Sequence, residues 1–145
     1  ALPILPEFIL LRNPGRFIES AFRGRSIRKD AFSDDDIAAY TEAVSKPGAL
    51  SAGINYYRAA LRGPLLNPFS KPPPMDELII RVPTLLIWGE QDHALGIELT
   101  HDLEQYFDAP FEIHYVPDTS HWVQQEQPED CCEATLDFLA RYASA

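Results

Sequence analysis

Residues 84–88 form an unbroken apolar run, TLLIW, that begins behind a proline and ends at Gly89. An apolar run this short and without alternation predicts a strand buried on both faces of a parallel sheet. A helical stretch at about 97–107 follows, then a second strand at 111–116 and a last helix at about 128–142. The order strand, helix, strand, helix is that of a βαβ unit with a trailing helix, so we predict the α/β fold class.

This sheet should be incomplete within the 145 residues, because three or more strands are normally needed for a stable sheet. Either the protein forms a homodimer across the open edge, or the remaining strands lie in sequence missing from this chain. The only methionine is Met75, in mid-chain, so the chain opens without an initiator. We therefore expect a piece of a longer polypeptide, with the missing N-terminal half of the same protein as its partner.

The first part of the chain, residues 1–70, is predicted to be helical. Ser33 followed by three aspartates is an N-cap with carboxylates in the first helical turn. A Pro-Gly pair at 47–48 ends that helix, and a second helix follows with a stripe of apolar residues on one face. That stripe comprises Leu50, Ile54, Tyr57 and Leu61. Residues 8–22 predict two short helices broken at 13–15.

Proline-rich sequence joins the two halves of the chain. Five prolines between positions 64 and 74 deny that segment regular hydrogen bonding, so we predict an extended crossing as far as Pro83. The resulting organisation is a helical part at 1–70, a linker at 71–83 and an α/β part at 84–145.

Composition excludes several classes of function. The chain carries 22 acidic and 12 basic side chains, a formal net charge of −10, which argues against a nucleic-acid partner. No apolar run reaches the roughly 18 residues of a membrane span. The adjacent Cys131 and Cys132 cannot frame a disulfide scaffold, which favours a reducing, cytoplasmic setting. The sequence has no phosphate-binding glycine loop and no metal-ligand spacing, so neither a cofactor nor a metal is expected.

Two groups that could carry chemistry follow the two predicted strands. Asp92 comes after the first strand, and His121 comes after the second. Because the carboxyl ends of neighbouring parallel strands share one rim of the sheet, this carboxylate and this imidazole could meet. A carboxylate on one ring nitrogen fixes the tautomer and leaves the other nitrogen to act as a base. The order acid, then histidine, is that of a nucleophilic α/β hydrolase.

Structural roles are the competing interpretation of these residues. An aspartate after a strand often bonds its own backbone in a turn, and a single histidine is often a surface residue. We interpret His93, His101 and His114 in that way. No nucleophile is visible, because Ser51 lies at a predicted helix start without a preceding strand and the two cysteines lack an activating partner.

Three segments carry a family pattern: residues 46–58 (KPGALSAGINYYR), 88–92 (WGEQD) and 120–129 (SHWVQQEQPE). Together they resemble the C-terminal part of an α/β hydrolase of the epoxide hydrolase family, with residues 1–70 as its helical lid, or cap. The resemblance implies that Asp92 and His121 are acid and base, and that Tyr57 is one of two substrate-activating tyrosines. It also implies that the nucleophilic aspartate and the second lid tyrosine precede this chain, which alone should be inactive.

The mechanism that this resemblance implies opens an epoxide to a vicinal diol in two steps. An aspartate attacks an epoxide carbon to give a hydroxyalkyl-enzyme ester, while Tyr57 hydrogen-bonds the ring oxygen. His121, oriented by Asp92, then activates water to hydrolyse the ester. The implied substrates are a small hydrophobic epoxide and water.

Other interpretations stay open at this point. Tyr57 would equally suit a core aromatic on its helical stripe. A haloalkane or haloacetate dehalogenase shares the aspartate nucleophile and the histidine base on the same fold, and an esterase would carry a serine upstream. A non-catalytic interaction module that has kept the sheet and lost the chemistry is the alternative from a different class.

Overall fold

The chain divides into two compact units. A computed structural model describes residue 7 and residues 10–62 and 74–142. A helical unit comprises Ala1–Gly24 and Phe32–Pro73, and a sheet unit comprises Arg25–Ala31 and Pro74–Ala145. Residues 25–31, which end in the 3₁₀ turn η1 (Lys29–Ala31), are therefore an excursion of the chain out of the helical unit.

The first described helix of the helical unit is α2, Pro14–Ala21. It begins after Asn13, whose side chain accepts a hydrogen bond from the backbone N–H of Arg16 at 3.0 Å. A proline at the first helical position costs nothing, because that N–H would have no partner within the helix. The predicted break within residues 8–22 is thus a helix start; residues 8 and 9 lie outside the described part of the chain.

Two longer helices complete the described part of this unit: α3, Asp34–Ser45, and α4, Ala49–Arg62. The predicted N-cap of α3 is confirmed as a capping box. The N–H of Asp36 donates to Ser33 Oγ at 3.1 Å, and the N–H of Ser33 donates to Asp36 Oδ2 at 2.9 Å. The stop before residues 47–48 is also confirmed, since α3 ends at Ser45.

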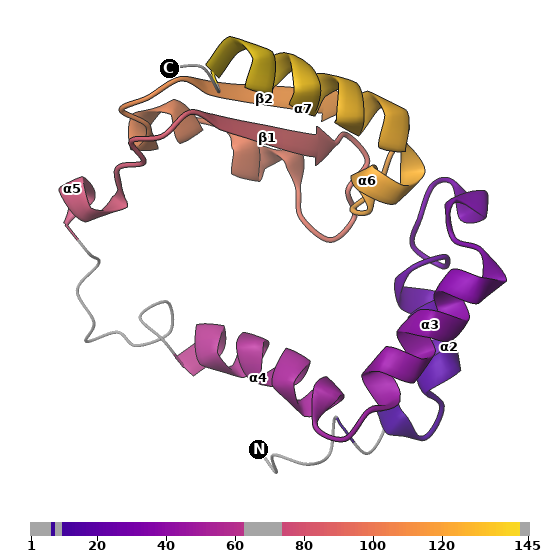
Figure 1. Ribbon diagram of the computed structural model, residues 1–145. Helices are drawn as coiled ribbons and strands as arrows, with labels where there is room; N and C mark the ends of the chain where they lie inside the picture. Colours follow the sequence, from indigo (N-terminus) through magenta and orange to yellow (C-terminus); the bar gives the residue numbers. More distant parts are fainter. Residues whose placement is uncertain (1–6, 8–9, 63–73, 143–145) are drawn as a thin grey trace. The chain divides into compact units, whose positions relative to one another are not determined.

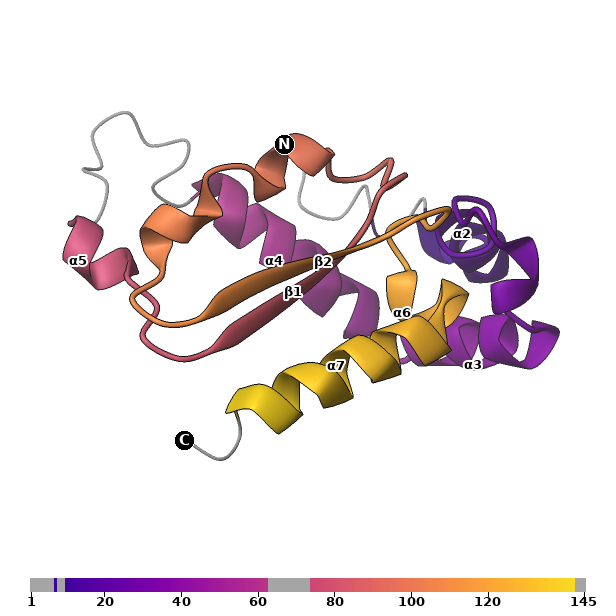
Figure 2. The same cartoon turned by 90° about the horizontal axis from the view of Figure 1, so that it is seen from above.

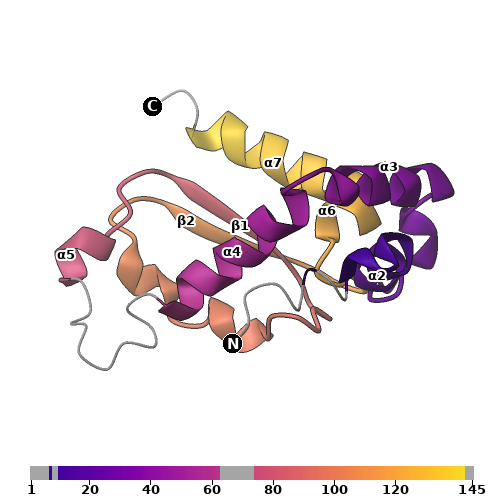
Figure 3. The same ribbon diagram turned by 90° about the horizontal axis from the view of Figure 1, so that it is seen from below.

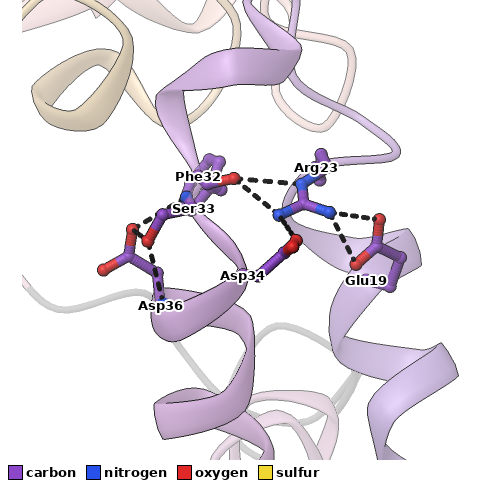
Figure 4. Close-up of polar contacts among 6 residues, drawn as sticks. All are labelled: Glu19, Arg23, Phe32, Ser33, Asp34 and Asp36. Carbon is purple, nitrogen blue, oxygen red and sulfur yellow. Dashed lines mark hydrogen bonds and ion pairs between the residues drawn. The ribbon is translucent and has the colours of Figure 1, made fainter.

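Arg23 and Phe32 flank the excursion at residues 25–31 and are hydrogen-bonded to each other, as Figure 4 shows; we call this pair the neck of the excursion. The Nε and Nη2 groups of Arg23 donate to the Phe32 carbonyl at 3.0 and 2.8 Å. Nη2 also donates to Asp34 at 2.8 Å, and Nη1 donates to Glu19 at 3.1 Å. The Phe32 ring is 2% exposed and packs edge-on against Phe22, so this neck is anchored in the core of the helical unit.

In its described residues, the sheet unit contains two parallel strands, β1 (Thr84–Gly89) and β2 (Phe111–Val116). Their register runs from Thr84 opposite Phe111 to Gly89 opposite Val116 (Figure 1). Both strands lie where the sequence predicts them, and their parallel pairing confirms the α/β class. The prediction of burial on both faces is wrong, because residues 84–88 are half-buried beside a single neighbouring strand.

Helical segments lie on both faces of the strand pair, as Figures 1, 2 and 3 show from three directions. The last helix, α7 (Pro128–Tyr142), covers one face, and its Asp130 bonds to His114 of β2 at 2.9 Å. The opposite face carries two 3₁₀ turns, and the Thr100 hydroxyl there bonds to the Tyr115 hydroxyl at 2.6 Å. A single turn, α6 (Val123–Glu126), precedes α7.

The helix predicted at about 97–107 is wrong as a continuous element. Two 3₁₀ turns stand in its place, η2 (Ile97–Thr100) and η3 (Leu103–Tyr106), separated by Asp102 in the left-handed region with φ 57°. Thr100 explains the break. Its buried hydroxyl donates to the Ile97 carbonyl at 2.7 Å while bonding to the sheet, which competes with a helical ladder.

The described end of the linker is not wholly extended. One helical turn, α5 (Met75–Leu78), follows Pro74 directly. Proline is tolerated there because the first residues of a helix have no intrahelical acceptor for their N–H groups. The first half of the predicted extended crossing, residues 64–73, lies outside the described part of the chain.

Candidate active site

The loops that follow the two strands lie side by side and are joined by backbone hydrogen bonds. Gly89, the last residue of β1, is in register with Val116, the last residue of β2. The N–H of Glu90 donates to the Val116 carbonyl at 3.1 Å, and the N–H of Gln91 donates to the Thr119 carbonyl at 3.0 Å. The backbone itself therefore holds the loop after β1 against the loop after β2.

Gly89 permits this close approach. A Cβ atom at position 89 would overlap the Ser120 carbonyl oxygen and lie 2.8 Å from the Thr119 carbonyl oxygen. Both are backbone atoms, so neither can move aside without shifting the loop that carries His121. The glycine of the segment WGEQD thus has a tertiary role that the sequence analysis missed.

Asp92 and His121 meet on this rim. The Oδ2 atom of Asp92 lies 2.7 Å from Nδ1 of His121, and the two side chains are 6% and 40% exposed. The other carboxylate oxygen of Asp92 accepts the N–H groups of Ala94 at 2.7 Å and Leu95 at 3.0 Å. The turn-forming role and the orienting role of Asp92 are therefore filled by different oxygens of one carboxylate.

Two opposing effects set the acidity of Asp92. Burial acts to raise the pKa of its carboxyl group, while the His121 ring and the N–H groups of Leu95 and Ala94 act to lower it. The bonds to the charged form prevail, so the pKa of Asp92 lies below its ordinary value of 3.8. At neutral pH the carboxylate is ionised and accepts the Nδ1 proton of His121, which directs the lone pair to Nε2.

The histidine loop has a second anchor, Glu126, which the sequence analysis also missed. Its side chain is buried, although it lies in the one-turn helix α6. Its carboxylate accepts the N–H of Ser120, directly before His121, at 3.2 Å. The sequence holds a weak signal for this burial, because Val123 one turn earlier on the same helix face is apolar and also buried.

Tyr57 lies in the other unit, on α4, and its side chain is not part of a core. Among the described residues it is 70% exposed, and its ring contacts that of Tyr56 edge-on with 5.8 Å between centroids. The next residue, Arg58, donates to the two carboxylate oxygens of Glu7 at 2.6 and 3.0 Å. The predicted buried stripe therefore fails at Tyr57.

The other histidines are placed as the sequence analysis interprets them. His93 and His101 are exposed, and His114 is engaged with Asp130 across the face of β2 that α7 covers. Among the described residues, no three His, Cys, Asp or Glu side chains come together to hold a metal ion.

Neither of the other nucleophile candidates is activated. Ser51 lies in the first turn of α4, a helix rather than a strand-to-helix elbow. Burial first, and then the neighbouring Asp130 and Cys132, raise the pKa of the Cys131 thiol, which disfavours the reactive thiolate. In the part of the chain that is described, no helix is both long and apolar enough to cross a membrane.

Comparison with known proteins agrees with this geometry. The sequence matches the Alpha/beta hydrolase family over residues 2–134. It is 32% identical over 142 residues to "Epoxide hydrolase 3" of Xenopus tropicalis. This match covers 95% of this chain and 36% of that protein. It is 33% identical over 142 residues to "Epoxide hydrolase 4" of Homo sapiens, and this match covers 95% of this chain and 37% of that protein. The chain thus spans little more than a third of the length of these curated relatives.

A solved structure supports the same assignment at the level of the backbone. It is described as one of the "Novel epoxide hydrolases belonging to the alpha/beta hydrolases superfamily in metagenomes from hot environments". It superimposes with a TM-score of 0.61 and 30% sequence identity, over 74% of this chain and 38% of that one. The chain therefore belongs to the alpha/beta hydrolase family, and within that family it is epoxide hydrolase-like.

Proposed function

We propose that this chain is the part of an epoxide hydrolase that carries the water-activating histidine and one substrate-activating tyrosine. The observation that carries the proposal is the 2.7 Å contact between Asp92 and Nδ1 of His121 on the shared rim of the two strands. Relatives named epoxide hydrolases, matched over 95% of this chain, support the choice of reaction.

The first step needs a nucleophile, which the described residues do not supply in activated form. We propose that an aspartate in a segment outside residues 1–145 attacks an epoxide carbon. The carbon–oxygen bond of the ring breaks and an ester forms between that aspartate and the opened substrate. The phenol of Tyr57 donates a hydrogen bond to the ring oxygen, stabilises the developing alkoxide and passes its proton to it, after which water reprotonates the phenolate.

The second step belongs to His121. Its Nε2 atom removes a proton from water, and the resulting hydroxide attacks the ester carbonyl. Asp92 stabilises the imidazolium that forms, as the carboxylate does in other acid–histidine pairs. Collapse of the tetrahedral intermediate releases the vicinal diol, whose new hydroxyl takes the proton from the imidazolium ring. The aspartic acid that forms loses its proton to water, which balances the proton taken up in the first step and restores the carboxylate. A small, hydrophobic epoxide and water are the proposed substrates.

The proposed test is His121→Gln in the protein that joins residues 1–145 to the segment supplying the nucleophile. Loss of the base should leave ester formation intact and slow hydrolysis by about 10² to 10⁴, so that a covalent adduct accumulates. Intact mass after mixing with a hydrophobic epoxide measures that adduct. Exposed His101 provides the matched control, His101→Gln, which should turn over like the wild type. Full turnover by His121→Gln would contradict the proposal. So would a wild-type protein that releases halide from a haloalkane but forms no diol from the epoxide.

A further inference from the structure

Glu126 is a buried carboxylate for which the proposed reaction has no direct use. It is 2% exposed, and both of its oxygens are engaged. One oxygen, Oε2, accepts the N–H groups of Ile27 and Arg28, each at 3.0 Å. The other, Oε1, accepts the Ser120 N–H at 3.2 Å and is also hydrogen-bonded to the Ser120 hydroxyl. Burying a carboxylate is costly unless it is paired in this way, so the site is built around the charge.

The two sides of this carboxylate connect distant parts of the chain. Ser120 is 2% exposed and directly precedes His121. Ile27 and Arg28 belong to the excursion at residues 25–31, whose chain ends both return to the helical unit. Arg28 reinforces the contact, because its guanidinium donates to the Glu126 carbonyl at 2.8 Å and to the Gln127 side chain at 2.9 Å.

The excursion is restrained by a link between its two ends and by burial of its middle. Its neck is closed by the hydrogen bonds from Arg23 to the Phe32 carbonyl, drawn in Figure 4. Its middle residue Ser26 is 2% exposed. A short segment whose two ends are brought together and whose middle is buried has little conformational freedom left.

An amide cannot replace this carboxylate. Oε2 faces two backbone N–H donors, and Oε1 faces a third together with a hydroxyl. The NH₂ group of a glutamine would point at N–H donors on one side or the other, and would leave that side without an acceptor. Glu126→Gln therefore detaches the Ser120 side or the Ile27 side while keeping nearly the same volume.

We propose that Glu126 is a positioning residue for His121. Through Ser120 it fixes the backbone that aims the imidazole at Asp92, and through Ile27 and Arg28 it ties that backbone to residues 25–31 of the same unit. Its effect on turnover rests on the proposed function. Its effect on the imidazole does not, because the contact between His121 and Asp92 exists without substrate.

The expected consequence follows from the geometry of a reacting group. The bond between Asp92 and His121 is 2.7 Å long, and a shift of about 1 Å in the loop would break it. Misplacement of a reacting group by that amount costs about 10²-fold in rate. The penalty should fall on hydrolysis of the ester, where His121 acts, and leave ester formation unchanged.

The first experiment follows the Nδ1 proton of His121 by NMR in the substrate-free protein that also contains the nucleophile segment, with its signal assigned from His121→Gln. In Glu126→Gln this proton should exchange with water about tenfold faster, which corresponds to ~1.4 kcal/mol of weakened hydrogen bonding. The matched control is Glu129→Gln, which removes the charge of an exposed glutamate nearby and should leave the exchange rate unchanged.

The second experiment measures single-turnover rates of ester formation and ester hydrolysis with a hydrophobic epoxide. Glu126→Gln should slow hydrolysis by about 10²-fold and leave formation within about twofold. A folded Glu126→Gln with wild-type proton exchange and wild-type hydrolysis would overturn the proposal. If the wild type itself lacks epoxide turnover, the proposed function fails, and the exchange rates alone still decide the role of Glu126.

Ser120→Ala keeps the proposal falsifiable should Glu126→Gln not fold. It removes only the hydroxyl contact to Glu126 and retains the backbone N–H and the contacts to Ile27 and Arg28. The Nδ1 proton of His121 should then exchange faster than in the wild type, by a smaller factor than in Glu126→Gln. An unchanged exchange rate in Ser120→Ala would overturn the proposal.

Discussion

The rim of the sheet unit and the exposed face of α4 hold their functional candidates in opposite ways. The Asp92 side chain is 6% exposed and its two oxygens bond to His121 and to the backbone of its own loop. Tyr57 is 70% exposed and meets only the neighbouring Tyr56 ring among the contacts described for its side chain. The rim is organised within its own unit, whereas Tyr57 is exposed on its helix among the described residues.

This difference teaches where each residue should be sensitive. A group whose geometry depends on backbone bonds, such as His121, should lose function through changes in residues that never touch substrate. A group presented on an exposed helix face should lose function only through its own hydroxyl. The substitutions below separate these two cases.

Asp92→Asn should have the largest effect. An asparagine keeps the shape but no longer fixes the Nδ1–H tautomer or stabilises an imidazolium at His121, so kcat should fall by about 10⁴-fold. Steady-state kinetics on a hydrophobic epoxide measures the change. Asp102→Asn is the matched control, because Asp102 is exposed and asparagine tolerates its left-handed backbone. Equal losses in the two variants would contradict the rim as the source of the effect.

Gly89→Ala should come next, as a loss of stability. The added methyl group would overlap the Ser120 carbonyl, and backbone must move to relieve it, at a cost of about 3 kcal/mol in the free energy of unfolding. Urea denaturation measures this value. The comparison variant is Gly53→Ala in α4, where nothing lies within 4 Å of the new methyl group. That change should stabilise the protein by about 0.5 to 1 kcal/mol, because alanine favours a helix.

Tyr57→Phe should lower kcat by about 10²-fold, the usual cost of removing one donor to a developing oxyanion. Because Tyr57 is exposed, the free energy of unfolding should change by less than about 0.5 kcal/mol. Tyr56→Phe removes the neighbouring hydroxyl, from a side chain that is 76% exposed, and should leave kcat unchanged. Normal turnover by Tyr57→Phe would return this residue to a role in packing or solubility.

The smallest expected effect is on the acid side of the stability profile. The pKa of Asp92 is lower in the folded protein than its ordinary 3.8, so folding favours the ionised carboxylate. This stabilisation is complete well above pH 3.8 and is lost as the pH falls through the lowered folded value. The unfolding free energy of Asp92→Asn should therefore depend less steeply on pH below about pH 4 than that of the wild type. Parallel profiles for the two proteins would be incompatible with the lowered pKa.

Much of the rim could be predicted from the sequence, because its determinants are local. The two apolar runs fix the strands, and the parallel direction of neighbouring strands brings their carboxyl ends to one edge. Asp92 and His121 are therefore predicted to meet from their places just after the strands, and the structure confirms that contact. The capping box at Ser33 is equally local, since its partners lie within one helical turn.

Glu126, Gly89, Thr100 and Tyr57 could not be placed in this way. Glu126 meets Ile27 and Arg28 from 99 and 98 residues away along the chain, and no periodicity links those positions. Helical spacing puts Tyr57 and Leu50 on the same face of α4. Whether a side chain on that face is buried depends on which residues pack against it, and Leu50 is buried while Tyr57 is exposed.

The sequence by itself determined the order of the elements, the parallel strand pair and the meeting of Asp92 with His121, because hydrophobic period, capping and the geometry of parallel strands act over short distances along the chain. Only the tertiary structure decided that Gly89 must lack a side chain, that Thr100 breaks a helix and that Glu126 is buried under the histidine loop. Those outcomes depend on which distant backbone groups come within contact of each residue, and such contacts are set by the packing of the whole unit.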